Sequence, residues 1–323
     1  RTANYCVPLR NSLIDPDWQR EIKASYPEIF KICMETPGAF IHQFDPRSAL
    51  EVPKEERLEQ YEKLWAEPGF KKWLANFQDI MIPGKANEDY AEFVRNKIRE
   101  RVKDPVVAEM LVPKDHPFGS KRLPCETGYY DTYNRGNVLL VDLRDAPIER
   151  LTPKGIKTSD AEYELDVIIF ATGYDAVTGS LTRIDIHGEG GRTLKDKYAE
   201  GPRNYMGIQS AGFPNLFTMP GAGAGNFTRG CEPLVEWVTD CIDYMRENEF
   251  TRISASPQAE EAWTKYVAEA SANLLRTKAN SWFVGANIPG KARVLLGSPD
   301  SAPVMRTKRA EAAANGYDGF LLQ

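Results

Sequence analysis

Hydrophobic positions between residues 11 and 112 recur at helical spacing, and prolines divide the pattern into short segments. The clearest segment places its apolar side chains on one face of a helix, at Tyr90, Phe93, Val94, Ile98 and Val102. Each proline ends or begins a segment, because it cannot continue a helix. We therefore predict a series of helices over this part of the chain.

After Pro113 the pattern changes to short apolar runs between turn residues, which predict strands at residues 137–142, 148–151 and 163–171. Within the third run, Val167–Phe170 is continuously apolar, as in a strand buried on both faces of a parallel sheet. Two more helices follow at helical spacing, one with Val235, Val238, Ile242 and Met245, and the other with Trp263, Tyr266, Val267, Ala270 and Leu274. This order of elements predicts an α/β fold.

The composition fits a globular protein of about two domains and limits the partners that it can bind. The chain has 323 residues, of which 42% are hydrophobic and 27% are charged, so it can form real cores. Lys and Arg number 41 and Asp and Glu number 46, and the net charge of -5 offers no basic surface to nucleic acid or an anionic membrane. We expect a small neutral or amphipathic ligand.

Five cysteines lie far apart along the chain, and none forms a Cys-x-x-Cys pair. This pattern favours a reducing compartment and argues against a structural zinc site, so we expect no metal. No apolar run approaches the roughly 20 residues that span a membrane. The first residues do not have the pattern of a signal peptide. We therefore predict a cytoplasmic protein.

A short motif directly follows the apolar strand, with the sequence Ala171-Thr172-Gly173-Tyr174-Asp175. The motif would lie at the carboxyl end of a sheet strand, where α/β folds bind their ligands. Glycine there lets the backbone approach a flat cofactor closely. By itself the motif fits an ordinary strand-ending turn about as well as a flavin site. Its candidate cofactor contacts are Thr172, Gly173 and Asp175.

The wider sequence around this motif resembles a known family. Residues 164–175 are similar to the hinge strand of class B flavin monooxygenases. Residues 201–207, 212–217, 281–291 and 315–320 resemble, in this order, segments of Baeyer–Villiger monooxygenases of the phenylacetone and steroid type. These segments span nearly the whole chain. The resemblance implies the C-terminal part of such an enzyme, with partial FAD- and NAD(P)-binding Rossmann-like domains and a helical insert.

Residues 117–122, with the sequence PFGSKR, match a loop to which the family gives two roles. The resemblance places Arg122 beside the flavin as the catalytic residue, and Lys121 at the 2′-phosphate of NADPH. A guanidinium is a permanent cation with fixed donors, suited to keep a flavin C4a-peroxide anionic and to stabilise its adduct with a ketone. An ammonium suits a phosphate. Without the resemblance, a solvated basic pair on a loop would be the better interpretation.

The resemblance implies further cofactor contacts. Arg1 and Thr2 match residues that bind the 2′-phosphate, and a frayed terminus is the alternative. Trp282 matches a tryptophan near the nicotinamide ribose, and a core aromatic is an equally good interpretation of a lone tryptophan. Gly223 and Phe227 match positions against the isoalloxazine, just before a helix whose N-terminus would support developing negative charge.

The sequence also departs from the family. Residues 224–233 are shorter than expected and lack the usual serine-rich text, and residues 296–300 replace an aromatic and paired glycines. The substrate pocket, and with it the choice of ketone, therefore stays open. Neither Gly-x-Gly-x-x-Gly loop of the family is present, since residues 221–225 lack the final spacing. None of the three histidines lies in the fingerprint that the family carries between these loops.

The predicted organisation has three parts. Residues 1–10 and 113–165 would form part of an NADP-binding domain, residues 11–112 a helical insert, and residues 166–323 the C-terminal part of an FAD-binding domain. The missing phosphate loops imply that an N-terminal portion of the enzyme is absent from this sequence or is supplied by a partner chain. The complete enzyme would use FAD, NADPH and O2 to convert a small ketone to an ester or lactone.

Two alternatives stay open at this point. The first is a related flavin N-hydroxylase or NADPH oxidase, which residues 281–291 disfavour and a screen of ketones against amines would test. The second is a degenerate, cofactor-free partner module, which the short loop and the missing phosphate loops support. The visible spectrum of the purified protein tests the second, because a flavoprotein is yellow.

Overall fold

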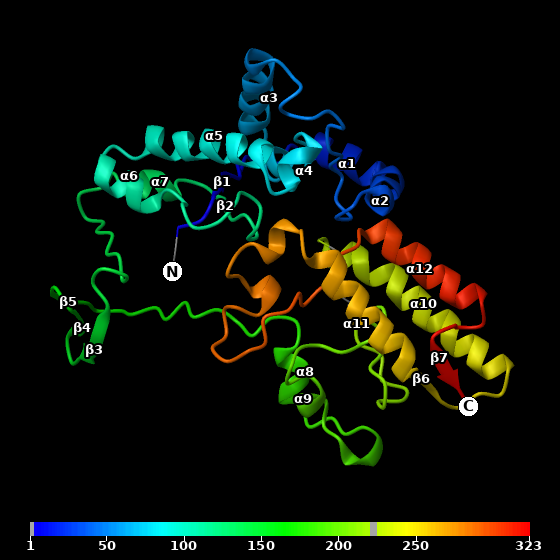
Figure 1. Ribbon diagram of the computed structural model, residues 1–323. Helices are drawn as coiled ribbons and strands as arrows, with labels where there is room; N and C mark the ends of the chain where they lie inside the picture. Colours follow the sequence, from blue (N-terminus) through cyan, green and yellow to red (C-terminus); the bar gives the residue numbers. More distant parts are fainter. Residues whose placement is uncertain (1–2, 220–224) are drawn as a thin grey trace. The chain divides into compact units, whose positions relative to one another are not determined.

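The computed structural model describes residues 3–219 and 225–323, and these divide into two compact units. Unit 1 comprises the described residues up to Asn11 together with Arg47–Tyr174. Unit 2 comprises Ser12–Pro46 together with the described residues from Asp175 to Gln323. The α-helices and strands of both units are labelled in Figure 1. The motif at residues 171–175 therefore contains the point where one unit ends and the other begins.

Unit 1 is mainly helical, with α3 (Lys54–Ala66), α4 (Lys71–Leu74), the 3-10 helix η1 (Gln78–Met81), α5 (Lys85–Arg101), α6 (Pro105–Leu111) and α7 (Tyr129–Thr132). Helix α5 confirms the amphipathic pattern, because its apolar face is buried. That face contributes to an aromatic core that includes Tyr5, Tyr61, Phe77, Tyr90, Phe93 and Phe118. Since aromatic rings bury large apolar areas, this core stabilises the fold of unit 1.

The strands of unit 1 are short. The pair β1 (Val7–Pro8) and β2 (Cys125–Glu126) is parallel, and it joins the beginning of the unit to the segment after the PFGSKR loop. A separate antiparallel sheet has the order β3 (Ile148–Thr152), β4 (Gly155–Thr158) and β5 (Glu162–Glu164). Strand β3 confirms the prediction at residues 148–151.

Two other strand predictions were wrong. Residues 137–142 form no strand, and of residues 163–171 only the first two belong to a strand, β5. The expected buried strand is an exposed extended segment, with exposed fractions of 74% at Val167, 84% at Ile169 and 63% at Phe170. A strand needs a neighbour that completes its hydrogen-bond ladder, and within residues 3–219 and 225–323 no segment pairs with this one.

Unit 2 contains α1 (Pro16–Ala24), α2 (Tyr26–Glu35), α8 (Gly179–Arg183), η2 (Glu189–Gly191), α9 (Leu194–Lys197), α10 (Phe227–Glu247), β6 (Ile253–Ala255), α11 (Pro257–Ser271), η3 (Leu275–Thr277), η4 (Trp282–Val284), α12 (Ala302–Ala314) and β7 (Phe320–Leu322). Helices α10 and α11 confirm the two predicted C-terminal helices, although Leu274 lies beyond the end of α11. The core lies among α10, α12 and the antiparallel pair of β6 and β7.

The region predicted as one helical insert is helical, but it is divided between the units. Helices α1 and α2 belong to unit 2, where α2 contacts α10 and α12. One link is a hydrogen bond of 2.8 Å from Arg306 Nη1 to the carbonyl oxygen of Met34. Periodicity shows which face of a helix is apolar but not which element covers it. The assignment of the pieces to NADP- and FAD-binding domains stays a prediction.

Helices and sheets together confirm the α/β class. The described part of the chain contains no helix that is long and apolar enough to cross a membrane. It also contains no cluster of three or more His, Cys, Asp or Glu side chains placed to hold a metal ion.

A fully buried lysine, Lys72, holds one end of the β1 strand. Its ammonium donates hydrogen bonds to the carbonyl oxygens of Pro8 at 3.0 Å and Gly69 at 3.2 Å, and also to that of Glu67. Burial, with the nearby Arg10 charge, lowers the pKa of Lys72 to about 8. Three backbone acceptors therefore offset only part of the desolvation of this charge.

This pKa predicts how stability depends on pH. Above pH 8 the folded lysine loses its proton before the unfolded chain does, so the unfolded state binds more protons and stability rises with pH. Relative to Lys72→Met, the wild type should gain roughly 2 kcal/mol between pH 8 and pH 10. Chemical denaturation of both proteins at several pH values measures this gain. A difference that stays constant over this range would contradict it.

Candidate functional site

The PFGSKR loop is anchored firmly in unit 1. Phe118 lies fully buried in the aromatic core, and its carbonyl oxygen accepts a hydrogen bond of 2.8 Å from Asn87 of α5. Gly119 has a φ of +77°, and a Cβ there would lie 3.1 Å from the indole nitrogen of Trp73. Because only glycine fits this turn without strain, the loop has a fixed path into the two basic residues that follow.

Arg122 stands at the end of this loop with its side chain exposed. Its guanidinium carbon lies 5.5 Å from the centre of the Phe70 ring, a cation–π contact that restrains the side chain. Its carbonyl oxygen accepts a hydrogen bond of 3.2 Å from the Asn4 side chain. The guanidinium is thus held at the surface, where its charge is available to a bound molecule.

Lys121, the preceding residue, is less exposed, with 16% of its side-chain surface accessible. Its ammonium lies 3.8 Å from a carboxylate oxygen of Asp115. Two adjacent cations of the sequence motif are therefore present on one loop, each with contacts that limit its movement. Asp115, Asn4 and Phe70 escaped the sequence analysis because they are separated from the motif by up to 118 residues or are common surface types.

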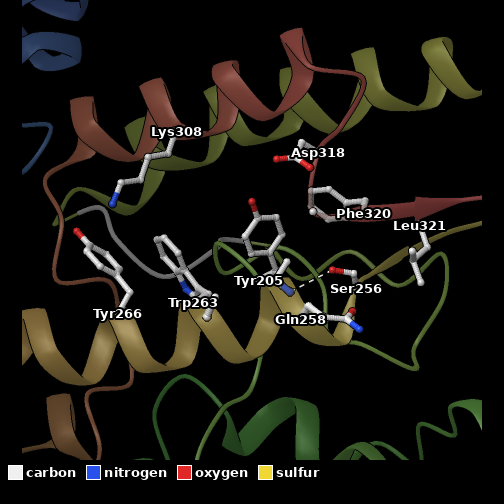
Figure 2. Close-up of a pocket in the computed structure, with 12 residues that line it drawn as sticks. Tyr205, Ser256, Gln258, Trp263, Tyr266, Lys308, Asp318, Phe320 and Leu321 are labelled. Carbon is white, nitrogen blue, oxygen red and sulfur yellow. Dashed lines mark hydrogen bonds between the residues drawn. The ribbon is translucent and has the colours of Figure 1, made fainter.

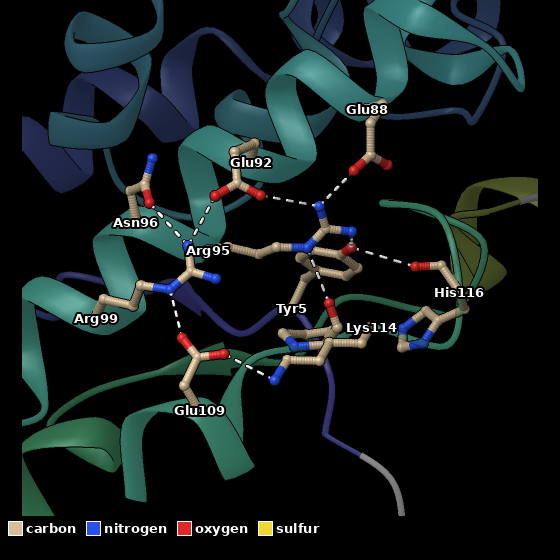
Figure 3. Close-up of polar contacts among 10 residues, drawn as sticks. Tyr5, Glu88, Glu92, Arg95, Asn96, Arg99, Glu109, Lys114 and His116 are labelled. Atoms are coloured by element: carbon tan, nitrogen blue, oxygen red, sulfur yellow. Dashed lines mark hydrogen bonds and ion pairs between the residues drawn. The ribbon is translucent and has the colours of Figure 1, made fainter. Parts of the chain in front are cut away.

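A network of charged side chains on α5 supports the segment before the loop (Figure 3). Arg95 donates hydrogen bonds to the Pro113 carbonyl oxygen at 2.9 Å and to the Tyr5 hydroxyl at 2.9 Å. The Tyr5 hydroxyl in turn donates to the carbonyl oxygen of His116 at 3.2 Å. Further ion pairs join Glu88, Glu92, Arg99, Glu109 and Lys114. The loop is therefore tied to the longest helix of unit 1.

In unit 2, an ion pair joins two motifs that the sequence analysis treated separately. The ammonium of Lys291, at the end of the 281–291 segment, contacts the Asp175 carboxylate and donates to the Ala176 carbonyl oxygen at 3.2 Å. Both side chains of the pair are largely buried. A Cβ at Gly179 would lie 2.5 Å from the Asp175 side chain, so glycine is required there. Asp175 is thus a structural partner of the 281–291 segment.

The aromatic candidates of unit 2 lie at exposed positions. Trp282 begins η4 with 36% of its surface exposed, and its ring packs against Phe283 with the centroids 4.1 Å apart. Phe227 is the first residue of α10 and is 62% exposed. Asn226 caps this helix and donates to the Ala39 carbonyl oxygen at 3.0 Å. Neither ring is a core aromatic, so both can meet a ligand.

The remaining predicted cofactor contacts are either exposed or outside the described residues. Thr172 and Gly173 lie exposed at the end of unit 1, and Gly173 has a φ of +82°. Arg1, Thr2 and Gly223 lie outside the described residues. Among the described candidates, the fold brings together Asp175 and the 281–291 segment, whereas Lys121 and Arg122 are neighbours in the sequence itself.

Unit 2 also has a hollow of about 770 Å³ between α11, α12 and the start of β7 (Figure 2). Aromatic rings of Tyr205, Trp263 and Tyr266 line it beside Lys308. Lys308 lies 3.9 Å from the centre of the Tyr266 ring and 2.8 Å from the Asp300 carboxylate. Its charge is thus already compensated, and none of the predicted site residues lines this hollow.

We compared the sequence and the structure with those of known proteins. No family model matches the sequence. The 2-oxo-Δ3-4,5,5-trimethylcyclopentenylacetyl-CoA monooxygenase of Pseudomonas putida is 45% identical over 100% of this chain and 60% of its own length. Cyclopentanone 1,2-monooxygenase of Comamonas sp. is 40% identical with the same coverage. Phenazine N-monooxygenase of Lysobacter antibioticus is 35% identical, again over 100% of this chain and 60% of its own length.

Solved structures agree. A crystal structure of OTEMO in complex with FAD and NADP has a TM-score of 0.95 at 46% identity, covering 100% of this chain and 61% of that one. The closed structure of cyclohexanone monooxygenase has a TM-score of 0.95 at 38% identity, also with 61% of its chain covered. The fold is thus that of flavin-dependent monooxygenases. Over its whole length the chain is similar to Baeyer–Villiger monooxygenases, and it spans about 60% of the length of these relatives.

Proposed function

We propose that the complete protein is a cytoplasmic FAD- and NADPH-dependent Baeyer–Villiger monooxygenase that converts a small ketone and O2 to an ester or lactone. The observation that carries this proposal is the rigid loop with Lys121 and Arg122, in a chain whose whole length matches ketone monooxygenases. FAD, when bound, supplies the activation of O2, and NADPH supplies the hydride.

The donor set of this chain fits these two cofactors in part. Two adjacent cations suit the negatively charged end of NADPH and a reacting centre at which negative charge develops. The exposed Trp282 ring suits packing against a nicotinamide ribose. The phosphate loops are not among the residues of this sequence, so the pyrophosphate groups would be held by another part of the protein.

Arg122 would stabilise negative charge that develops during oxygen transfer to the ketone carbonyl. The guanidinium stays protonated at any working pH, so it offers fixed donors rather than a proton. The Phe70 ring restrains the guanidinium, and the Asn4 hydrogen bond restrains the Arg122 backbone, before substrate arrives. A preorganised cation costs little reorganisation as charge develops, which is the main source of its effect.

The exposed segment Val167–Phe170 supports a role for a further part of the protein. Three apolar side chains of this segment are more than 60% exposed, and its backbone pairs with no other described strand. Such an exposed apolar edge is typical of a surface that another segment covers. Pairing with strands of a nucleotide-binding sheet would bury them, as the continuous apolar run originally suggested. We propose that the missing N-terminal portion of the enzyme supplies these strands.

N-hydroxylation is a second candidate function, because a phenazine N-monooxygenase is 35% identical over the whole chain. The full-length protein, purified with its flavin, should be incubated with NADPH and either cyclopentanone, cyclohexanone or phenazine. Formation of a lactone supports the ketone monooxygenase. Formation of an N-oxide alone supports the N-hydroxylase, and NADPH oxidation without either product supports an oxidase. A colourless full-length protein that binds no flavin would contradict all three.

Replacement of Lys121 tests the contact with the 2′-phosphate. In the full-length enzyme, Lys121→Ala should raise KM for NADPH about 10- to 100-fold, since a hydrogen bond to a charged group is worth about 1.5–3 kcal/mol. KM for NADH, which lacks this phosphate, should change little. Steady-state kinetics with both coenzymes measures the ratio. Lys114→Ala removes a nearby exposed lysine that is paired with Glu109 and serves as the control. Equal effects on both coenzymes would contradict the assignment.

A further inference from the structure

One buried imidazole connects the two basic residues of the loop. The His116 side chain is only 1% exposed. Its Nδ1 lies 2.6 Å from Asp115 Oδ1, and its Nε2 lies 3.3 Å from Asn4 Oδ1. The other oxygen of Asp115 faces the Lys121 ammonium, and the amide nitrogen of Asn4 donates to the Arg122 carbonyl oxygen. His116 therefore connects the Lys121 side chain, through Asp115, with the Arg122 backbone, through Asn4.

Both ring nitrogens of His116 face an acceptor. The Asn4 oxygen must point at the ring, because the Asn4 amide nitrogen donates to Arg122 and its oxygen also accepts from the Tyr5 N–H at 2.9 Å. A neutral imidazole has a single N–H, so one of its two contacts would bring two lone pairs together. The imidazolium donates at both nitrogens. Only the protonated ring therefore completes the connection from Asp115 to Asn4.

The surroundings oppose this proton in the absence of a ligand. Burial, the largest effect, lowers the pKa of His116, and the charges of Lys121 and Arg95 lower it further, whereas Asp115 raises it. The Tyr5 ring packs edge-on against the imidazole, with the ring centroids 5.3 Å apart. The net result is a pKa below the ordinary value of 6.5. An anion that offset the Lys121 charge would favour protonation.

We propose that His116 is a positioning residue that couples binding of an anionic phosphate at Lys121 to the placement of Arg122. With the Lys121 charge offset by the phosphate, the imidazole takes up one proton from solvent, and its Nε2–H then holds Asn4 against the Arg122 carbonyl. The inference rests on the proposed function, in which Lys121 meets the 2′-phosphate of NADP(H). Because linkage is reciprocal, protonation of His116 also strengthens NADP+ binding.

The proton can be observed directly in the full-length enzyme with its flavin. With histidine labelled with 13C at Cε1, NMR follows each imidazole through a pH titration, and the resonance that His116→Gln loses is that of His116. Saturating NADP+ should raise the pKa of this resonance, whereas NAD+, which lacks the 2′-phosphate, should not. The half-exposed His187 of unit 2 provides a reference resonance, assigned by His187→Gln.

Binding measurements test the coupling without catalysis. From pH 8 to pH 6, the NADP+ affinity of the wild type should improve about fivefold or more relative to that of His116→Gln. Titration of the phosphate itself affects both proteins equally, so it cancels in this ratio. Asp115→Asn changes a half-exposed side chain, tests the same connection with little risk to folding, and should remove the same pH dependence.

Two results would overturn the proposal. One is a His116 resonance whose pKa is unchanged by NADP+, and the other is a pH dependence of NADP+ affinity that is identical in wild type, His116→Gln and Asp115→Asn. In either case the wild type would still form ester from ketone. A wild type that binds NADP+ but forms no ester would instead overturn the proposed function, so the two failures are distinguishable.

Discussion

In the full-length enzyme, Arg122→Ala should still permit reduction of FAD by NADPH but should lower ester formation by a factor of about 10²–10³. The expected separation follows from the position of the guanidinium at the exposed end of the PFGSKR loop, where it offers charge without a proton. Its removal takes away stabilisation of negative charge in the oxygen-transfer step and leaves hydride transfer intact. Rapid-mixing spectroscopy follows flavin reduction, and gas chromatography measures the ester.

The controls for this prediction separate charge from geometry. Arg122→Lys keeps a cation but loses the planar donor fork, so we expect an intermediate rate. Arg144→Ala removes another exposed arginine of unit 1, which is paired with Asp142, and should leave ester formation unchanged. An ester yield equal to that of the wild type in Arg122→Ala would exclude a catalytic role for this residue.

The parts of the fold that could be predicted are those that depend on local pattern. Helices α5, α10 and α11 follow apolar positions three and four residues apart. The structure buries this face on α5, and on α10 it buries Val238 and Met245, whereas the predicted positions of α11 are only partly buried or exposed. Strand β3 lies between turn residues and pairs with its sequence neighbour β4. In each case the information lies within about twenty residues of the element.

The parts that could not be predicted depend on partners distant in sequence. The run Val167–Phe170 has the composition of a buried strand, yet among the described residues it has no ladder and stays exposed. Helices α1 and α2 were predicted as part of a single helical region, but α2 packs against α10, which begins at Phe227, and against α12, which begins at Ala302. The apolar face of a helix indicates that another element packs against it, but it does not indicate which element.

The candidate site shows the same division. Lys121 and Arg122 could be proposed from the sequence because the family motif is contiguous, and Trp282 and Phe227 are exposed. The Asn4–His116 contact joins residues 112 positions apart, and a histidine outside the fingerprint gave no signal of its own. The side chains that position a cation are therefore harder to find from sequence than the cation itself.

Unit 2 depends on a buried ion pair, and breaking it should cost about 3–5 kcal/mol. Lys197 and Glu260 each have only 6% of their side-chain surface exposed and lie 2.8 Å apart. The same two groups bind both backbone polar groups of one residue, because Lys197 donates to the Ala211 carbonyl oxygen and Glu260 accepts from the Ala211 N–H. Glu260→Gln leaves the lysine charge buried without its counter-ion. Chemical denaturation, monitored by tryptophan fluorescence, measures the loss in the free energy of unfolding.

A matched exposed pair and a double variant identify the cause. The neighbouring Glu261 pairs with Arg203 at the surface, so Glu261→Gln should cost less than about 1 kcal/mol. Lys197→Met combined with Glu260→Leu removes both charges and should be less destabilised than Glu260→Gln alone, because no uncompensated charge stays buried. If the double variant were instead the less stable of the two, the pair would contribute through the hydrogen bonds to Ala211 rather than through compensation of charge.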